Sequence, residues 1–243
     1  MSGHSKWSTI KRDKEKTDQA RGKIFTKIGK EIAVAVKAGG PDPANNPRLA
    51  TVIAKARSNN MPNDNIQRSI KKASGEGSNI SYESMIYEGY GPGGSAVICE
   101  ILTDNKNRAS SDVRHIFDRA GGALGGPGSV AYMFEKKAVI ATKAKDGMTE
   151  DDLTMVALEI EADDVEIAPE GYTFVGDATK LATMRDSLLA QGYEVVSAEQ
   201  EMIANSLMDL PEDKYASFIK MLDNLEENDD VQNVFHNVNM IEE

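Results

Sequence analysis

The chain is short of cysteine and of long apolar runs. Its single cysteine, Cys99, lies in an apolar stretch and cannot form an internal disulfide, so a buried thiol in a reducing compartment is expected. No apolar run reaches the roughly 18 residues of a transmembrane helix, and no apolar segment follows the basic N-terminus as in a secretory signal. We therefore expect a cytoplasmic protein without a membrane partner.

Motifs for catalysis, cofactors and metals are also missing. No Gly-x-x-x-x-Gly-Lys-Ser/Thr sequence occurs, which argues against a P-loop nucleotide hydrolase. The three histidines, His4, His115 and His236, are not spaced as metal ligands, and the acids of 159–166 lack the spacing of a calcium loop. Because no nucleophile–base set can be picked out either, we predict a non-enzymatic protein with no cofactor, metal or small-molecule substrate.

Positive charge is scarce overall but concentrated at one end. The 243 residues hold 28 Lys and Arg against 39 Asp and Glu, a net charge of −11. Residues 1–80 hold 16 Lys and Arg and 7 acids, whereas residues 81–243 hold 12 and 32. Such asymmetry indicates a basic working domain carried by an acidic body, and it favours nucleic acid as the partner of the basic end.

The most basic stretch is residues 1–37, with ten Lys or Arg and four acids. Its second half has the spacing of an amphipathic helix, whose apolar stripe runs from Ile24 to Val36 opposite a column of lysines. The first half is a basic arm with one aromatic residue, Trp7. A phosphate backbone suits such a stretch, and Trp7 could stack on a base. The alternative is a solvated lysine face, with Trp7 packed on the core.

Two more short helices are predicted before residue 80, one begun by Asn46 and Pro47 and one from about Asp64 to Ala73. Three helices with one apolar stripe each predict a small helical domain with an outward basic surface. The turn between the last two helices, Ser58–Asn63, is six residues long. This is longer than the turn of a typical DNA-binding helix–turn–helix motif. The candidate nucleic-acid contacts are Lys6, Trp7, Lys11, Arg12, Lys14, Arg21, Lys23, Lys27, Lys30, Arg48, Lys55, Arg57, Arg68, Lys71 and Lys72.

Beyond residue 80 the pattern changes to strands and helices. The predicted strands are 82–90, 95–103, 129–135, 137–144, 165–168, 172–175, 194–204 and 230–238, and the predicted helices end near Ala120, Ile160, Gln191 and Glu227. The glycine runs Gly89–Gly94 and Gly121–Gly126 do not open a helix, so we interpret them as turns. Polar residues follow the second strand, and we name Asn105, Asn107 and Arg108 as a possible secondary site, with Asn107 as the helix cap.

The predicted fold class is α+β, with three domains: an N-terminal three-helix domain and two ferredoxin-like α/β domains. Residues 1–80 form the basic arm and helical domain, residues 81–135 and 206–243 a discontinuous domain, and residues 136–205 an inserted βαββαβ domain.

Several ordered runs carry a family resemblance. They are Ser2–Trp7, Arg21–Lys27, Ala44–Leu49, Tyr87–Gly94 and Asp229–Val234. In these runs, which extend nearly end to end, the chain resembles the YebC/PmpR family. This chain differs from the family pattern at Asp13, because the corresponding run in the family is more basic.

The resemblance implies the same three-domain layout and a bacterial cytoplasmic protein described as a transcriptional regulator. It also implies relatives, among them a mitochondrial translational activator, that act on translation and ease stalling at proline runs. We therefore predict a DNA-binding regulator of transcription, with a ribosome- or rRNA-associated translation factor as the alternative. A second alternative is a protein-interaction adaptor that acts through the acidic domains. The oligomeric state, monomer or weak dimer, stays open.

Overall fold

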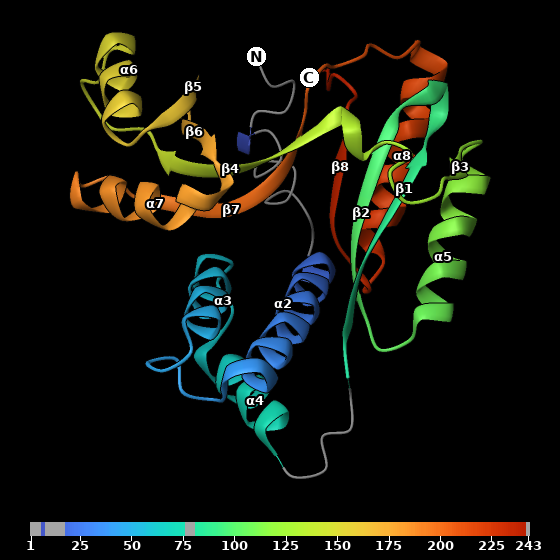
Figure 1. Ribbon diagram of the computed structural model, residues 1–243, viewed down its shortest axis with the longest axis horizontal. Helices are drawn as coiled ribbons and strands as arrows, with labels where there is room; N and C mark the ends of the chain where they lie inside the picture. The colour runs from blue at the N-terminus through green and yellow to red at the C-terminus, as the bar shows by residue number, and fades with distance from the viewer. Residues whose placement is uncertain (1–5, 8–17, 76–80, 242–243) are drawn as a thin grey trace. The chain divides into compact units, whose positions relative to one another are not determined.

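The computed structural model describes residues 6–7, 18–75 and 81–241 (Figure 1). The chain divides into two compact units, each built from segments far apart in the sequence. The first unit, named the helical unit because it holds the three N-terminal helices, comprises Lys16–Val130 and Pro211–Val234. The second unit comprises Ala131–Leu210 with Met1–Glu15 and Phe235–Glu243. The three-domain boundaries near residues 80, 135 and 205 stay a prediction.

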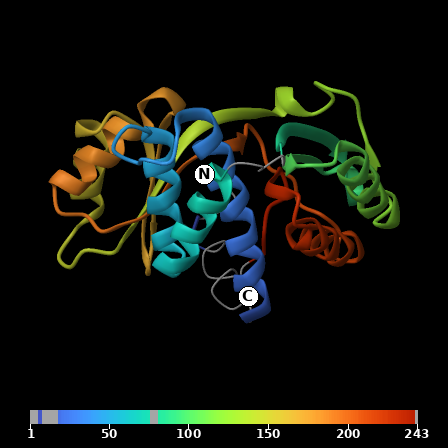
Figure 2. The same cartoon turned by 90° about the horizontal axis from the view of Figure 1, so that it is seen from below.

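Three helices open the helical unit: α2 (Asp18–Gly39), α3 (Pro47–Ser58) and α4 (Asn63–Ser74). In Figure 2, α2 lies alongside α3 and α4. The apolar stripes predicted from the sequence meet in one core, whose buried members are Ile28, Ile32, Ala35, Val36, Leu49, Val52, Ile53, Ala56, Met61, Ile66 and Ile70. Asn46 caps α3 as predicted, because its side chain accepts a hydrogen bond from the backbone N–H of Leu49.

The connection between α3 and α4 is shorter than the sequence indicated. Four residues, 59–62, separate the two helices, because Ser58 and Asn63 are themselves helical. Asn60 takes a left-handed conformation, with φ of 57°, and Met61 turns into the core. The predicted six-residue turn was therefore wrong, and its length no longer argues against a helix–turn–helix arrangement.

A four-stranded sheet completes this unit, in the order β3-β1-β2-β8. Its strands are β1 (Glu83–Tyr90), β2 (Ala96–Thr103), β3 (Ala123–Leu124) and β8 (Val231–His236). β1 and β2 form the predicted antiparallel hairpin, and Gly93 and Gly94 supply the positive φ angles of 69° and 81° at its turn. Helices α5 (Lys106–Arg119) and α8 (Glu212–Glu227) pack together beside the sheet (Figure 1).

The strand predicted at Ser129–Glu135 is wrong for residues 129–133, whereas Phe134 and Glu135 already belong to the next strand. Residues 129–133 form a loop and a short 3₁₀ turn (Ala131–Met133), because the buried carboxylate of Glu88 accepts hydrogen bonds from the backbone N–H groups of Gly128 and Val130. The edge strand is instead β3, inside the glycine-rich run. A Cβ at Gly89 would lie 2.6 Å from the carbonyl oxygen of Ala123, so only glycine allows this close pairing.

The second unit has the predicted order β-α-β-β-α-β, in a sheet ordered β5-β6-β4-β7. Its elements are β4 (Phe134–Lys143), α6 (Glu150–Glu159), β5 (Ala162–Ala168), β6 (Gly171–Asp177), α7 (Leu181–Ala190) and β7 (Val195–Ala204). Thr149 and Asp152 form a capping box at the start of α6. Phe174, Met184 and Leu188 are fully buried between sheet and helices.

The α+β class is confirmed: three N-terminal helices precede two antiparallel sheets with their helices. Among the described helices, none combines the length and the apolar character that a membrane span requires.

Candidate nucleic-acid interface

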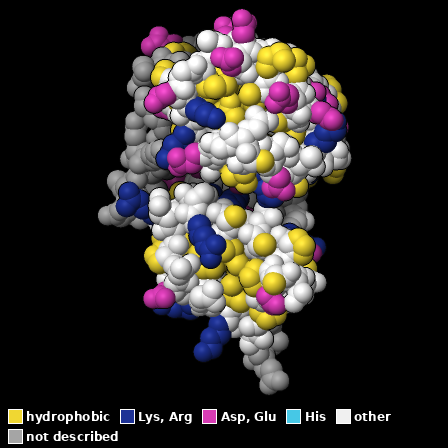
Figure 3. Space-filling view, turned by 90° about the vertical axis from the view of Figure 1, so that its left-hand side faces the viewer, with side chains coloured by type: hydrophobic (Ala, Val, Ile, Leu, Met, Phe, Trp, Pro, Cys, Tyr) yellow, Lys and Arg dark blue, Asp and Glu magenta, His cyan; other side chains and the backbone are white. Residues whose placement is uncertain are grey.

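A group of exposed basic side chains lies on α3 and α4. Residues 47–74 hold six Lys and Arg and one acid, Asp64. Five of these cations are exposed and form no ion pair with any residue that the structure describes: Arg48, Arg57, Arg68, Lys71 and Lys72. In Figure 3, Lys and Arg side chains project from the part of the surface where α3 lies. The sixth cation, Lys55, is 3.0 Å from the carboxylate of Glu31 on α2.

Three groups on the outward side of α4 lie on one face of that helix. Arg68 and Lys72 are one helical turn apart, and Lys71 is three residues after Arg68, whereas Ile66 and Ile70 turn into the core. The two lysines also occupy the last turn of α4, where positive charge is favourable next to the unpaired carbonyl groups. The local sequence thus places apolar groups inward and three cations in solvent.

The lysines of α2 have a different environment. Lys23 donates to the carbonyl oxygen of Glu227 at 3.1 Å, and Lys27 donates to that of Glu226 at 2.7 Å. These carbonyls belong to the last turn of α8, where helix carbonyls lack intrahelical partners and carry partial negative charge. The lysine column predicted from the sequence therefore contacts the C-terminal end of another helix.

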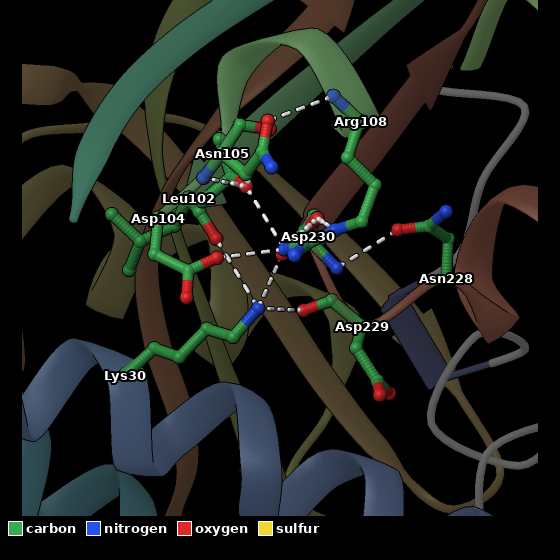
Figure 4. Close-up of polar contacts among 9 residues, drawn as sticks. Lys30, Leu102, Asp104, Asn105, Arg108, Asn228, Asp229 and Asp230 are labelled. Atoms are coloured by element: carbon green, nitrogen blue, oxygen red, sulfur yellow. Dashed lines mark hydrogen bonds and ion pairs between the residues drawn. The ribbon is translucent and has the colours of Figure 1, made fainter. Parts of the chain in front are cut away.

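The third lysine of the column reaches the buried carboxylate of Asp230 (Figure 4). Lys30 Nζ lies 2.6 Å from Asp230 Oδ1 and 2.8 Å from the carbonyl oxygen of Asp229. The side chain of Asp230 is only 4% exposed and that of Lys30 only 11%. A carboxylate this deeply buried requires charged partners, and Lys30 is one of them.

Arg108 is the second partner of Asp230. Its Nε and Nη2 donate to Asp230 Oδ2 at 3.1 and 2.8 Å, and Nη2 also lies 2.8 Å from Asp104. The hydrogen bonds to Asp230 and Asp104 raise the pKa of the Arg108 guanidinium above its ordinary value. Burial by itself raises the pKa of Asp230, but the hydrogen bonds from Lys30 and Arg108 outweigh burial and hold that pKa below its ordinary value.

Arg108, which belongs to the secondary site predicted after β2, and Lys30 of α2 therefore contact the same carboxylate. Asn105, not Asn107, caps α5, because its side chain accepts from the backbone N–H of Arg108 at 3.0 Å. The cap prediction for Asn107 was wrong: α5 begins at Lys106, so Asn107 is an exposed residue of its first turn. Sequence reasoning missed Asp230 as a site residue, because it placed Asp230 inside the last strand, which in the structure begins at Val231.

An open hollow of about 430 Å³ lies beside the cluster of Lys30, Arg108 and Asp230, within the same unit. Its wall includes Lys30, Arg108 and Asp230, and residues outside the cluster complete it: Thr26, Tyr82, Asp104, Asp112, Asn228 and Asp229. Water and ions can therefore reach one side of the ion pairs. In the described part of the chain, no group of three or more His, Cys, Asp or Glu side chains is arranged to hold a metal ion.

The N-terminal residues that the structure describes belong to the second unit. Lys6 pairs with Glu201 and lies 3.6 Å from Glu199, both on β7. Trp7 is 6% exposed and its ring covers Gly171, where an added Cβ would lie 2.4 Å from Cζ2. The core-packed alternative for Trp7 is the one observed in this structure. The candidates Lys11, Arg12 and Lys14 lie outside the described residues, and Arg21 is exposed at the start of α2.

Comparison with known proteins gives matches along most of the chain. The family model described as the TACO1/YebC protein N-terminal domain matches residues 5–76, and that of the TACO1/YebC second and third domain matches residues 82–238. A crystal structure of a conserved hypothetical protein from Aquifex aeolicus is 41% identical, with a TM-score of 0.84 and 94% of each chain covered.

Curated bacterial proteins are also similar to this chain. A probable transcriptional regulatory protein of Clostridium botulinum is 53% identical over 237 residues, covering 98% of this chain and 96% of that protein. One of Acetivibrio thermocellus, with the same description, is 51% identical over 238 residues and covers 98% of both chains. The expected family is confirmed, and the chain belongs to the TACO1/YebC family.

Proposed function

We propose that the protein is a non-enzymatic, cytoplasmic regulator of transcription that binds nucleic acid through the outer faces of α3 and α4. The observation that carries the proposal is the set of five exposed cations without an ion-pair partner among the described residues: Arg48, Arg57, Arg68, Lys71 and Lys72. The name of the curated relatives, probable transcriptional regulatory protein, supports the same role.

The physical basis is counterion release. Each phosphate that replaces the counterions around an exposed Lys or Arg contributes affinity that falls as salt concentration rises. Unpaired cations suit this role, because no internal ion pair must be broken before they contact a phosphate. The net charge of −11 repels nucleic acid elsewhere and confines binding to the basic surface. The basic arm, with Lys11, Arg12, Lys14 and Arg21, extends the proposed contact.

The proposal is tested by replacing Arg68, Lys71 and Lys72 together with Gln. Binding of a labelled DNA duplex, followed by fluorescence anisotropy over a salt series, should weaken, and the log–log salt slope should fall by about 2 to 3. The matched control replaces Lys143, Lys180 and Lys214 with Gln, which removes the same charge from lysines that are paired with acids. Equal loss in both variants would mean that only net charge matters.

Two further binding measurements on the same α4 variant separate the alternatives. Co-sedimentation with ribosomes that is lost in the α4 variant, together with weak DNA binding, favours the rRNA-associated translation factor. The adaptor hypothesis expects the α4 variant to keep its cellular protein partner and expects no salt-dependent binding of either nucleic acid. Backbone contacts of the kind proposed here suit DNA and RNA alike.

A further inference from the structure

We propose that Lys23, Lys27 and Lys30 form a releasable latch, which holds α2 to the end of α8 in the free protein and is displaced from it by a phosphate backbone. The latch would expose a second nucleic-acid contact that the free protein conceals. This inference rests on the proposed nucleic-acid function and adds a regulated step to it.

The acceptors at the outer end of the latch are weak compared with a phosphate. Lys23 and Lys27 donate to backbone carbonyl oxygens, and the carboxylate of Glu227, 3.7 Å from Lys23, is 70% exposed. An ammonium group binds an anionic oxygen more strongly than a neutral carbonyl, and exposed ion pairs contribute little. A polyanion can therefore compete for these two lysines.

The inner end is the strong part of the latch. Lys30 combines a 2.6 Å contact to Asp230 Oδ1 with a 2.8 Å hydrogen bond to the carbonyl of Asp229. Exposure of the lysine side chains falls from 34% at Lys23 to 11% at Lys30. Displacement is thus expected to begin at Lys23 and to be limited by the release of Lys30.

The geometry of Asp230 makes that release feasible. Arg108 donates to Oδ2, the oxygen that Lys30 does not contact, so Asp230 keeps a charged partner when Lys30 leaves. A buried carboxylate that lost its only cation would strongly destabilise the fold. The adjoining hollow, whose wall includes Asp230, gives water a route to this carboxylate. The arrangement therefore has a closed state with two cations on Asp230 and an open state with one.

Once released, the three lysines match a phosphate backbone in spacing. They lie at positions i, i+4 and i+7 of α2, on the side opposite its buried stripe, and so span about 10 Å along the helix axis. That length corresponds to the rise of about three phosphates on one DNA strand.

The test measures one distance within the helical unit. Ser74 at the end of α4 and Asp118 on α5 are both exposed, and each is replaced with Cys and spin-labelled; the natural thiol, Cys99, is buried and stays unlabelled. Pulsed electron paramagnetic resonance then reports the distance between the helical layer and the sheet layer. We expect a single narrow distribution for the free protein and a shifted or broadened one with a saturating DNA duplex.

The variant Asp230→Asn should show the shifted distribution without DNA and should bind the duplex about three- to tenfold more tightly, because less of the closed state must be opened. Asp223→Asn, an exposed position on α8 that no latch lysine contacts, is the matched control and should resemble the parent protein. A thermal melt of each variant shows whether it is folded.

An unchanged distribution in the parent protein at saturating DNA overturns the latch, and so does an Asp230→Asn distribution identical to that of the control. The first measurement needs no Asp230 variant, so it stays decisive if that variant does not fold. Absence of any DNA or ribosome binding by the parent protein overturns the proposed function and with it the phosphate trigger. In that case the distance between the two spin labels in the Asp230→Asn variant still shows whether Asp230 keeps α2 in the closed arrangement.

Discussion

Lys30 and Asp230 are 200 positions apart in the sequence, yet their charged atoms lie 2.6 Å apart in the folded protein. Lys30 is on α2, and Asp230 directly precedes the last strand, β8. The contact joins the predicted basic helix to the sheet of the same unit, with Arg108 on the other oxygen of the carboxylate. A lysine that the sequence presents as a solvent-facing cation is thus a partner of a buried acid.

The first prediction concerns the pH dependence of stability at Asp230. Because its folded-state pKa lies below the unfolded-state value of about 4, the ionised carboxylate stabilises the fold above that pH, and the stabilisation is lost as pH falls through the folded-state pKa. Asp230→Asn should lower the free energy of unfolding by about 3 kcal/mol at neutral pH. Urea denaturation at a series of pH values should show a smaller acid-dependent loss in the variant. Parallel pH curves for the two proteins would contradict this account.

The second prediction concerns the buried amide of Asn46. It accepts from the backbone N–H of Leu49 and donates to the carbonyl oxygens of Ala35 and Gly40, both at 2.8 Å. Asn46→Ala removes a helix cap and leaves two carbonyls without this donor, so unfolding free energy should fall by about 2 kcal/mol. Asn59→Ala, at the exposed C-terminal end of the same helix, should cost less than about 0.5 kcal/mol. Equal effects in chemical denaturation would show that burial of Asn46 does not matter.

The third prediction uses the single tryptophan of the chain as a reporter. Trp7 is packed on Gly171, so acrylamide should quench its fluorescence far less in the native protein than in urea. A saturating DNA duplex should leave the emission unchanged, because a buried ring cannot stack on a base. Quenching by the duplex, with the α4 triple Gln variant as the weakly binding control, would show that Trp7 leaves Gly171 and contacts nucleic acid.

The fourth prediction concerns the thiol of Cys99. Complete burial raises its pKa from 9.0 to about 12, which corresponds to about a thousandfold less thiolate at a given pH near neutrality. A disulfide reagent at pH 8 should therefore label Cys99 slowly in the native protein and rapidly in urea. Rapid labelling of the native protein at a rate independent of denaturant would mean that the strand carrying Cys99, β2, is accessible.

Elements that depend on neighbours in the chain could be predicted from the sequence. The inward stripes of α2, α3 and α4, the Asn46 cap and the Thr149 capping box follow from residues within one or two helical turns. The β-α-β-β-α-β order was predictable for the same reason, because strand and helix periods are local properties. The five exposed cations of α3 and α4 were also correctly placed opposite the core.

The positions of the remaining groups depend on contacts between residues far apart in the sequence. The glycine-rich run supplies β3 because the backbone of β1 approaches closely at Gly89, and Glu88 holds the following loop out of the sheet. Lys23, Lys27 and Lys30 look equivalent to Lys71 and Lys72 in sequence, yet their acceptors come from residues about 200 positions away. A cation's role depends on which carbonyl or carboxylate the fold brings within 3 Å of it, and no local pattern encodes that distance.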